Sequence, residues 1–366
     1  MNRQEILHWL TEPDAGALGA LWQRADRLRA ERVGTDVHLR GLIELSNRCR
    51  RNCLYCGLRA GNDRLERFTM TAEEVLAAAG AAARELGYGT VVLQAGEAGG
   101  LDAHAITELI SRLRERLNLA ITLSLGEWSE DVLAAWRQAG ADRYLLRIEA
   151  SNPRLHRRLH PPLAGEPTNG PLKRIEQLKT LRRLGYEIGS GVMVGLPGQT
   201  YADLADDILT FAELDLDMIG LGPYLPHPAT PLAAEPLAAE PAVGARPGPD
   251  DAVPNSETMA YKAVALARLA CPDANIPATT AVNVVNRACG YEQGLQRGAN
   301  VIMPNLTPAR YRKLYEIYPG KTSGEFEDPR SFRDGLTARI EAIGRRVGAG
   351  RGDSPRYLSR LSPAAR

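Results

Sequence analysis

The sequence predicts an α/β fold, a (β/α)8 barrel of the TIM type that carries an N-terminal helical extension. Eight short apolar runs alternate with amphipathic helical patterns along the chain. Buried parallel strands have this short apolar character, and eight strand-helix units make the common closed barrel. Polar residues and glycines follow several of the runs, where a barrel has its active-site mouth. An open doubly wound sheet is the alternative fold.

The candidate strands are short apolar runs, and polar residues or glycines end or follow several of them. They are HLRGLIELSN (38–47), TVVLQAG (90–96), LAITLSLG (119–126), DRYLLRIE (142–149), YEIGSGVMVG (186–195), MIGLGPY (218–224), ANIPATT (274–280) and ANVIMPN (299–305).

Helical patterns precede and separate these runs. Two lie before the first strand, at about 3–10 and 15–32, and five more lie at 71–87, 103–117, 129–140, 171–185 and 201–215. Thr71 and Glu74 have the spacing of a capping box, and Gly87, Gly140 and Gly185 stand where helices should end.

The chain divides into three predicted parts. Residues 1–34 form the helical extension, 35–347 the barrel and 348–366 a basic, loop-like tail. Five prolines in 233–256 predict an exposed insertion without regular structure. The Arg-Gly-Asp triplet in the tail is interpreted as a chance occurrence.

Composition excludes several function classes. The 366 residues carry a formal net charge of +1, which does not indicate a nucleic-acid or membrane surface. The first sixteen residues, MNRQEILHWLTEPDAG, carry charges throughout and lack the apolar stretch of a secretory signal. We therefore expect a soluble cytoplasmic protein; we also expect a monomer.

The most informative motif is a cysteine triplet. Cys49, Cys53 and Cys56 place three of the five cysteines within eight residues of a polar loop. A 4Fe-4S cluster is usually held by four thiolates, so three would leave one iron open to a ligand. An open coordination position is the mark of a catalytic metal site.

Three other interpretations compete with the cluster. Zinc could use the three cysteines and a histidine, with His38 the nearest, although structural zinc normally shows two separated ligand pairs. A disulfide framework does not suit an intracellular chain of this size. Inert buried cysteines seldom gather in a loop rich in Arg and Asn.

Polar residues at the strand ends are the other candidates. In QAGE (94–97) a glycine lets the backbone approach a ligand closely. Carboxylates suit a cationic ligand and arginine suits a carboxylate, which favours function for Glu149, whereas Glu127 is interpreted as part of a solvated ion-pair rim. Thr279 and Thr280 are candidates for binding a substrate anion.

The triplet CxxxCxxC, with Tyr55 before its last cysteine, resembles the radical S-adenosylmethionine (SAM) superfamily. In that superfamily the methionine part of SAM chelates the open iron, and the reduced cluster splits SAM to a 5′-deoxyadenosyl radical.

Longer stretches resemble one branch, the HydE family of FeFe-hydrogenase maturases, which is related to biotin synthase and methylornithine synthase. They are SNRCRRNCLYCGLR, VVLQAGE, TLSLGEW, AGADRYLLR, MVGLPGQT, LGPYLPHPATPLA, IPATTA, GANVIMPN and LYEIYPGK, spanning about 40–321.

The resemblance implies a role for each matching residue. The cluster is held by Cys49, Cys53 and Cys56. The SAM site comprises Tyr55, Gln94, Gly96, Glu97, Ser124, Glu149, Arg174, Met193, Met218 and Tyr315. The internal substrate cavity is lined by Arg147, Thr279, Thr280 and Tyr318, with Arg147 and Glu149 closest to catalysis.

The resemblance also implies a reaction. The family acts on a small precursor containing sulfur and iron, toward the di-iron subcluster of the hydrogenase H-cluster. A ferredoxin or flavodoxin supplies the electron, and another maturase delivers the precursor. Alternatives are a HydE-like enzyme with another small-molecule substrate and a non-catalytic iron–sulfur carrier.

Two departures from the family pattern bear on these expectations. No cysteine follows the YPGK stretch, so we do not expect the second cluster that many relatives carry there. Ile148 stands where the family pattern has a histidine, and a different substrate would follow if that position lined the cavity.

Overall fold

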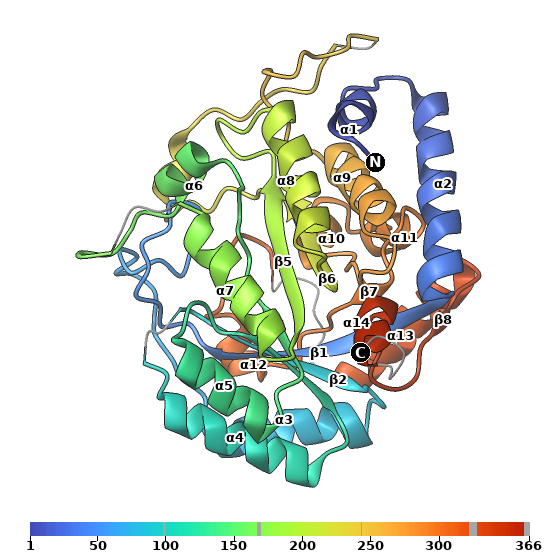
Figure 1. Cartoon of the computed structure of the whole chain (residues 1–366). Helices are drawn as coiled ribbons and strands as arrows, with labels where there is room; N and C mark the ends of the chain where they lie inside the picture. The colour runs from blue at the N-terminus through green and yellow to red at the C-terminus, as the bar shows by residue number, and fades with distance from the viewer. Residues whose placement is uncertain (98–99, 167–169, 243, 322–327, 362–366) are drawn as a thin grey trace.

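The computed structural model describes residues 1–97, 100–166, 170–242, 244–321 and 328–361. Seven parallel strands follow one another in the order β6-β5-β4-β3-β2-β1-β7 (Figure 1). They are β1 (Asp36–Ser46), β2 (Thr90–Ala95), β3 (Ala120–Ser124), β4 (Arg143–Leu145), β5 (Glu187–Val194), β6 (Met218–Pro223) and β7 (Val301–Ile302).

The seventh predicted strand is extended chain instead of a regular strand, and it closes the ring. Asn275 bridges to Met218 of β6, and Pro277 bridges to Val301 of β7, both in parallel. Single bridges replace a ladder here because proline has no amide hydrogen to donate and the chain enters a helix at Thr280. The predicted barrel of eight positions is confirmed.

Helices cover the outside of the ring, and the predicted helical patterns are confirmed with small shifts at their ends. The barrel helices are α3 (Ala72–Arg84), α4 (Ala103–Arg116), α5 (Glu130–Ala139), α6 (Pro153–Leu159), α7 (Leu172–Arg183), α8 (Tyr201–Glu213), α9 (Glu257–Ala270), α10 (Thr280–Val285), α11 (Gly290–Leu295), α12 (Ala309–Arg312) and α13 (Pro329–Ala342), with a 3-10 turn, η1 (Pro231–Ala234). The capping box of Thr71 and Glu74 is present. No described helix has the length and apolar character of a membrane span.

Alternation along each strand separates the core from the barrel interior. On β2, Val91 and Leu93 have no exposed surface and belong to the main apolar core between sheet and helices. Their neighbour Gln94, which pairs in register with Glu44 of β1, faces the opposite side and lines an internal cavity. Because side chains alternate between the two faces of a strand, the same short segments supply both the core and the cavity wall.

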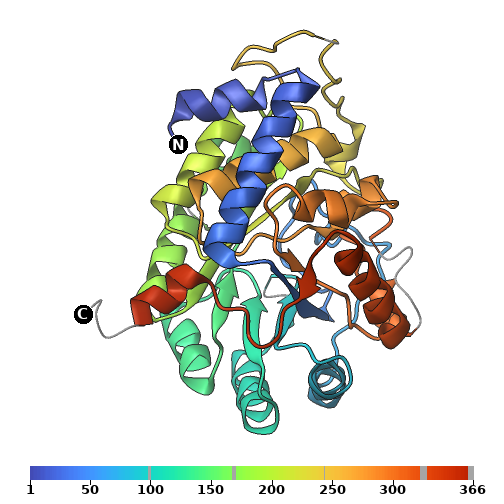
Figure 2. The same ribbon diagram turned by 90° about the vertical axis from the view of Figure 1, so that its right-hand side faces the viewer.

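The N-terminal extension consists of α1 (Arg3–Leu10) and α2 (Ala15–Val33), which pack on the barrel helices (Figures 1 and 2). The buried ammonium of Lys262 in α9 donates to the carbonyls of Leu10 and Glu12 at 2.9 and 2.8 Å. These bonds satisfy carbonyls left open at the end of α1. In the described residues of 235–255 the chain forms no helix and no regular strand; it extends beyond the barrel helices (Figure 1).

The C-terminal tail differs from the predicted loop. After a short strand, β8 (Arg346–Val347), which pairs with the start of β1, residues 348–354 cross the N-terminal end of the barrel and lead into α14 (Pro355–Leu361) (Figure 2). We call residues 348–354 the strap. The strap contains the Arg-Gly-Asp triplet, whose role in this structure is to bind the strand starts.

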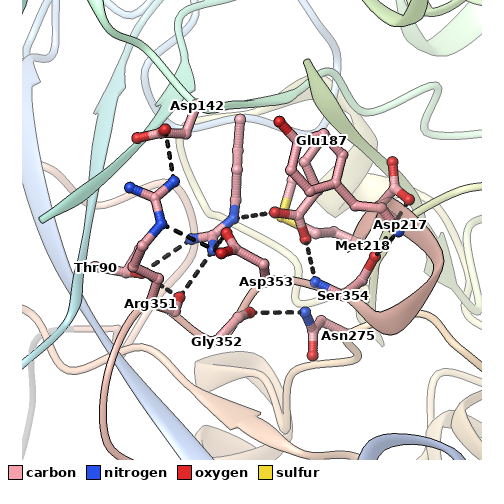
Figure 3. A network of polar contacts seen from close by, with 12 residues as sticks. Thr90, Asp142, Glu187, Asp217, Met218, Asn275, Arg351, Gly352, Asp353 and Ser354 are labelled. Carbon is pink, nitrogen blue, oxygen red and sulfur yellow. Dashed lines mark hydrogen bonds and ion pairs between the residues drawn. The ribbon is translucent and has the colours of Figure 1, made fainter. Parts of the chain in front are cut away.

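Figure 3 shows how the strap is bonded to those strand starts. The carbonyl of Arg351 accepts from Thr90 of β2 and Arg143 of β4, and the carbonyl of Gly352 accepts from Arg40 of β1. The Asp353 carboxylate pairs with Arg143, a residue with no exposed surface that also pairs with Glu187 of β5. The strap therefore caps this end of the barrel. Its Asp353, together with Glu187, balances the charge of the buried Arg143.

Asp353→Ala should destabilise the fold. The change leaves Arg143 with one carboxylate partner inside the barrel, and we expect a loss of about 2–3 kcal/mol in the free energy of unfolding. Urea titration followed by circular dichroism measures it, with Asp334→Ala as the control, since the Asp334 side chain is 72% exposed. Equal stability of both variants would contradict the role of the strap.

Candidate functional site

A cavity of about 300 Å³ opens at the C-terminal ends of the strands. Sixteen of the seventeen predicted site residues line it, although they come from segments far apart in the sequence. They are Cys49, Cys53, Tyr55, Cys56, Gln94, Gly96, Glu97, Ser124, Arg147, Glu149, Arg174, Met193, Thr279, Thr280, Tyr315 and Tyr318.

Met218 is the exception, because it does not line the cavity. It is the first residue of β6, and its sulfur accepts a hydrogen bond from Arg40 in the layer bound by the strap (Figure 3). The apolar run containing Met218 correctly predicts a strand. Met218 begins that strand, whereas the site is built from strand ends.

The cysteine loop lies directly on the end of β2. A side chain at Gly96 would place its Cβ 2.3 Å from the carbonyl oxygen of Arg48 and 2.8 Å from Cβ of Cys49. Asn47, fully buried, donates to the carbonyls of Glu66 and Leu314 at 2.7 and 2.9 Å, which holds the start of the loop. The glycine of QAGE is therefore required by the approach of the cysteine loop itself.

The three thiols line the cavity wall. Burial raises the pKa of Cys49, raises that of Cys53 well above its ordinary value and raises that of Cys56 to about 12. Such thiols stay protonated unless a cation compensates the thiolate charge, as bound iron would. Their softness and their position beside an open cavity fit an iron–sulfur cluster.

The zinc alternative based on His38 does not fit this geometry. His38 is the third residue of β1, while Cys49 follows the end of that strand. Ser46 lies eight residues after His38 along the strand, which is about 26 Å at the usual rise per residue. His38 lies instead against Gly348 and Gly352 at the strap.

A network of buried charges lies beside the cysteine loop. The guanidinium of Arg174 donates to Glu127 at 2.9 Å, to Glu97 at 3.0 Å and to the carbonyl of Arg147 at 2.6 Å. Arg51 pairs with the same two glutamates. The expectation that Glu127 forms a solvated rim is wrong, because Glu127 is buried and paired.

The network fixes the protonation state of its members. Burial alone would raise the pKa of Glu127, but the charge of Arg174 and bonds from Lys173 and Arg174 outweigh it and lower the pKa to about 2. Burial and the adjacent Arg174 hold the pKa of His160 well below its ordinary value, so His160 is neutral where its ring meets the Arg174 guanidinium at 2.7 Å.

Arg147 and Glu149 face the cavity from the end of the fourth strand. The guanidinium lies 3.0 Å from the carboxylate and donates to the carbonyl of Gly220 at 3.1 Å. A Cβ at Gly191 or at Gly220 would come within 3.1 Å of that guanidinium, so the glycines make room for it. Glu149 has φ of 64°, which is costly for a residue with a side chain and is typical of functional positions.

Ile148, the departure from the family pattern, does not belong to the cavity wall. It has no exposed surface and packs in the main apolar core. Arg147 and Glu149 on either side point the other way, as alternation requires. The replacement of the family histidine by Ile148 therefore alters the packing of the core behind the cavity and not the cavity wall.

The predicted hydroxyl groups lie where β6 and the seventh position approach each other. Thr279 precedes α10, and its buried hydroxyl oxygen has no hydrogen-bond partner in the described part of the chain. A Cβ at Gly222 would come within 2.7 Å of that oxygen. An unpaired buried hydroxyl at a cavity wall is suited to a ligand.

Sequence reasoning missed His160 and Lys321, which line the cavity, and Glu44, which is buried beside it. Glu44, fully buried in β1, pairs with Lys321 from the YPGK stretch. Alternation along β1 signals that Glu44 faces inward with Gln94, but nothing in the local sequence pairs it with a lysine 277 residues away.

Comparisons with known proteins identify the family. A model of the radical SAM superfamily matches residues 43–211. The [FeFe] hydrogenase maturase subunit HydE of Thermotoga maritima is 44% identical over 347 residues, which cover 95% of this chain and 92% of the relative. The chain belongs to the HydE family of radical SAM enzymes.

Solved structures agree with the barrel. Methylornithine synthase (PylB) superposes with a TM-score of 0.76 at 22% identity, covering 95% of this chain and 94% of that one. The FeFe-hydrogenase maturase HydG from Carboxydothermus hydrogenoformans gives 0.72 at 20% identity, covering 93% and 75%. Membership of the HydE family implies a 4Fe-4S cluster and SAM as cofactors.

Glu127→Gln should change how stability depends on pH. The folded pKa of about 2 lies below the ordinary 4.5, so the ionised Glu127 stabilises the protein above pH 4.5 and loses this effect as the pH falls toward 2. We expect the variant to be less stable by a few kcal/mol at pH 7 and to converge on the wild type near pH 2. Urea titrations from pH 7 to 3 measure this, with the exposed Glu176→Gln as the control; parallel curves would contradict the pairing.

Proposed function

We propose that Cys49, Cys53 and Cys56 hold one 4Fe-4S cluster whose fourth iron binds SAM, and that the enzyme uses this cofactor to mature the H-cluster of FeFe hydrogenase. The observation that carries the proposal is the shared cavity: three thiols, one buried and two half-buried, line the same space as the polar ends of the strands. The 44% identity with the HydE maturase of Thermotoga maritima supports the same reaction.

The protein residues bind and orient the cofactor. When bound, the cluster supplies an electron that cleaves SAM to methionine and a 5′-deoxyadenosyl radical. Gln94, Gly96 and Ser124 offer amide, backbone and hydroxyl groups at the ends of β2 and β3. Tyr55 and Met193 pack with the apolar cluster of Leu155, Leu159 and Tyr224, which suits an adenine ring.

The charged groups have separate roles. Glu149 is available to accept hydrogen bonds from the hydroxyl or amino groups of SAM, and Arg147 orients its carboxylate. Arg174 is already bonded to Glu97, Glu127 and the carbonyl of Arg147, so it chiefly holds the two glutamates in place beside the cysteine loop. The charge of Glu97 is thereby balanced by Arg174, so we assign Glu97 a structural role in the cavity wall more than a role in binding SAM.

Arg147, Thr279, Thr280 and Tyr318 lie on the part of the wall that we assign to the substrate. We propose a small precursor containing sulfur and iron, delivered by another maturase and destined for the di-iron subcluster. The strap caps the opposite end of the barrel, so the cavity is reached from the C-terminal ends of the strands. A ferredoxin or flavodoxin is the proposed electron donor to a monomeric enzyme.

Replacing any of the three cysteines should abolish SAM cleavage. Cys49→Ser, Cys53→Ser and Cys56→Ser each remove one proposed cluster ligand, and we expect 5′-deoxyadenosine formation to fall at least 100-fold, a loss of about 3 kcal/mol or more of barrier lowering. Chromatography of anaerobic, reduced reactions measures it. Cys271→Ser is the control, because Cys271 is buried like Cys53 but belongs to the apolar core.

Retention of full cleavage by any of the three variants would refute the cluster assignment. A non-catalytic carrier is distinguished by Arg174→Ala, which unpairs Glu97 and Glu127 beside the loop. The proposed enzyme loses SAM cleavage with this change while iron content is retained. A carrier makes no 5′-deoxyadenosine in either form.

A further inference from the structure

A buried ion pair, whose lysine lines the cavity, has no part in the function proposed above. Glu44 has no exposed surface and Lys321 is 4% exposed, and the ammonium pairs with the carboxylate. The amide of Asn305 donates to the other carboxylate oxygen at 3.2 Å. Removing two charges from water costs free energy that their attraction only partly returns, so such a pair contributes little to stability alone.

The pair acts on the ring of Tyr315. The ammonium of Lys321 lies 4.4 Å from the centroid of that ring, within the range of a cation–π contact. A hydrogen bond joins the side chains of Tyr315 and Gln94. Glu44 and Gln94 are register partners on β1 and β2. Two neighbouring strand residues therefore fix the ring of Tyr315. Gln94 bonds to its hydroxyl, and Glu44 holds Lys321 over its face.

The segment that carries Tyr315 and Lys321 also rests on the cysteine loop. Asn47 donates to the carbonyl of Leu314 at 2.9 Å, and the amide of Gly57 donates to the carbonyl of Ile317 at 3.1 Å. A Cβ at Gly57 would come within 2.3 Å of the carbonyl oxygen of Glu316. Lys321 thus anchors the far end of a segment whose middle touches the residue after Cys56.

We infer that Lys321, held by Glu44, is a positioning residue that fixes Tyr315 against bound SAM. The inference rests on the proposed function, because it takes the cavity beside the cysteines as the SAM site. Without the ammonium the ring gains rotational freedom, and SAM binding must then restrict that freedom at a cost in affinity.

The double variant Glu44→Gln, Lys321→Met separates positioning from stability. Lys321→Met alone leaves a buried carboxylate unpaired and should unfold at lower urea, whereas the double variant replaces both charges with neutral groups and should recover stability. SAM affinity should remain about tenfold weaker in both, because the cation above Tyr315 is absent in both. Anaerobic calorimetric titration of the reconstituted proteins with SAM measures the dissociation constant directly.

Two further variants complete the design. Lys321→Arg keeps a cation over the ring and should bind SAM as tightly as the wild type. Glu176→Gln, Lys179→Met removes an exposed ion pair and serves as the matched control. A wild-type dissociation constant for the double variant, or a tenfold loss in Lys321→Arg, would overturn the inference and leave the proposed function intact. Failure of the wild type itself to bind SAM would overturn the proposed function.

Discussion

Closure of the parallel strands into one ring is the constraint on which the rest of this structure depends. The ring is completed by two single bridges, Met218 to Asn275 and Pro277 to Val301. Because all strands run in the same direction, their carboxyl ends meet at one rim, and residues as distant as Gln94 and Thr279 come to line one cavity. Alternation along each strand sends the apolar neighbours of those residues outward into the core.

Several charged side chains inside the ring are held in ion pairs, and three of these pairings lie at different places in the barrel. At the closed end Arg143 is shared between Glu187 and Asp353 of the strap. Beside the cysteine loop Arg174 holds Glu97 and Glu127. Beside the cavity, Lys321 holds Glu44. An unpaired charge at any of these sites would carry a large desolvation cost, so the pairs keep both the fold and the site in one arrangement.

The features that could be predicted from sequence are those carried by local pattern. The spacing of Cys49, Cys53 and Cys56, the capping box at Thr71 and the eight apolar runs all act within a few residues. The features that were missed depend on contacts between residues far apart in the sequence, or on which end of a strand a residue occupies. The apolar run of β6 does not reveal that Met218 starts the strand and faces the strap, and the tail does not reveal that Asp353 meets Arg143, 210 residues earlier. Pairing of Glu44 with Lys321 likewise requires the closed ring.

The central claim is that three cysteines leave one iron open to SAM within this cavity. Electron paramagnetic resonance of the anaerobic, reconstituted and reduced protein, titrated with SAM, tests it most directly. The account predicts that the signal of the reduced cluster changes and that the change saturates at one SAM per cluster, because a single iron accepts the ligand. A spectrum that stays the same through an excess of SAM would contradict it.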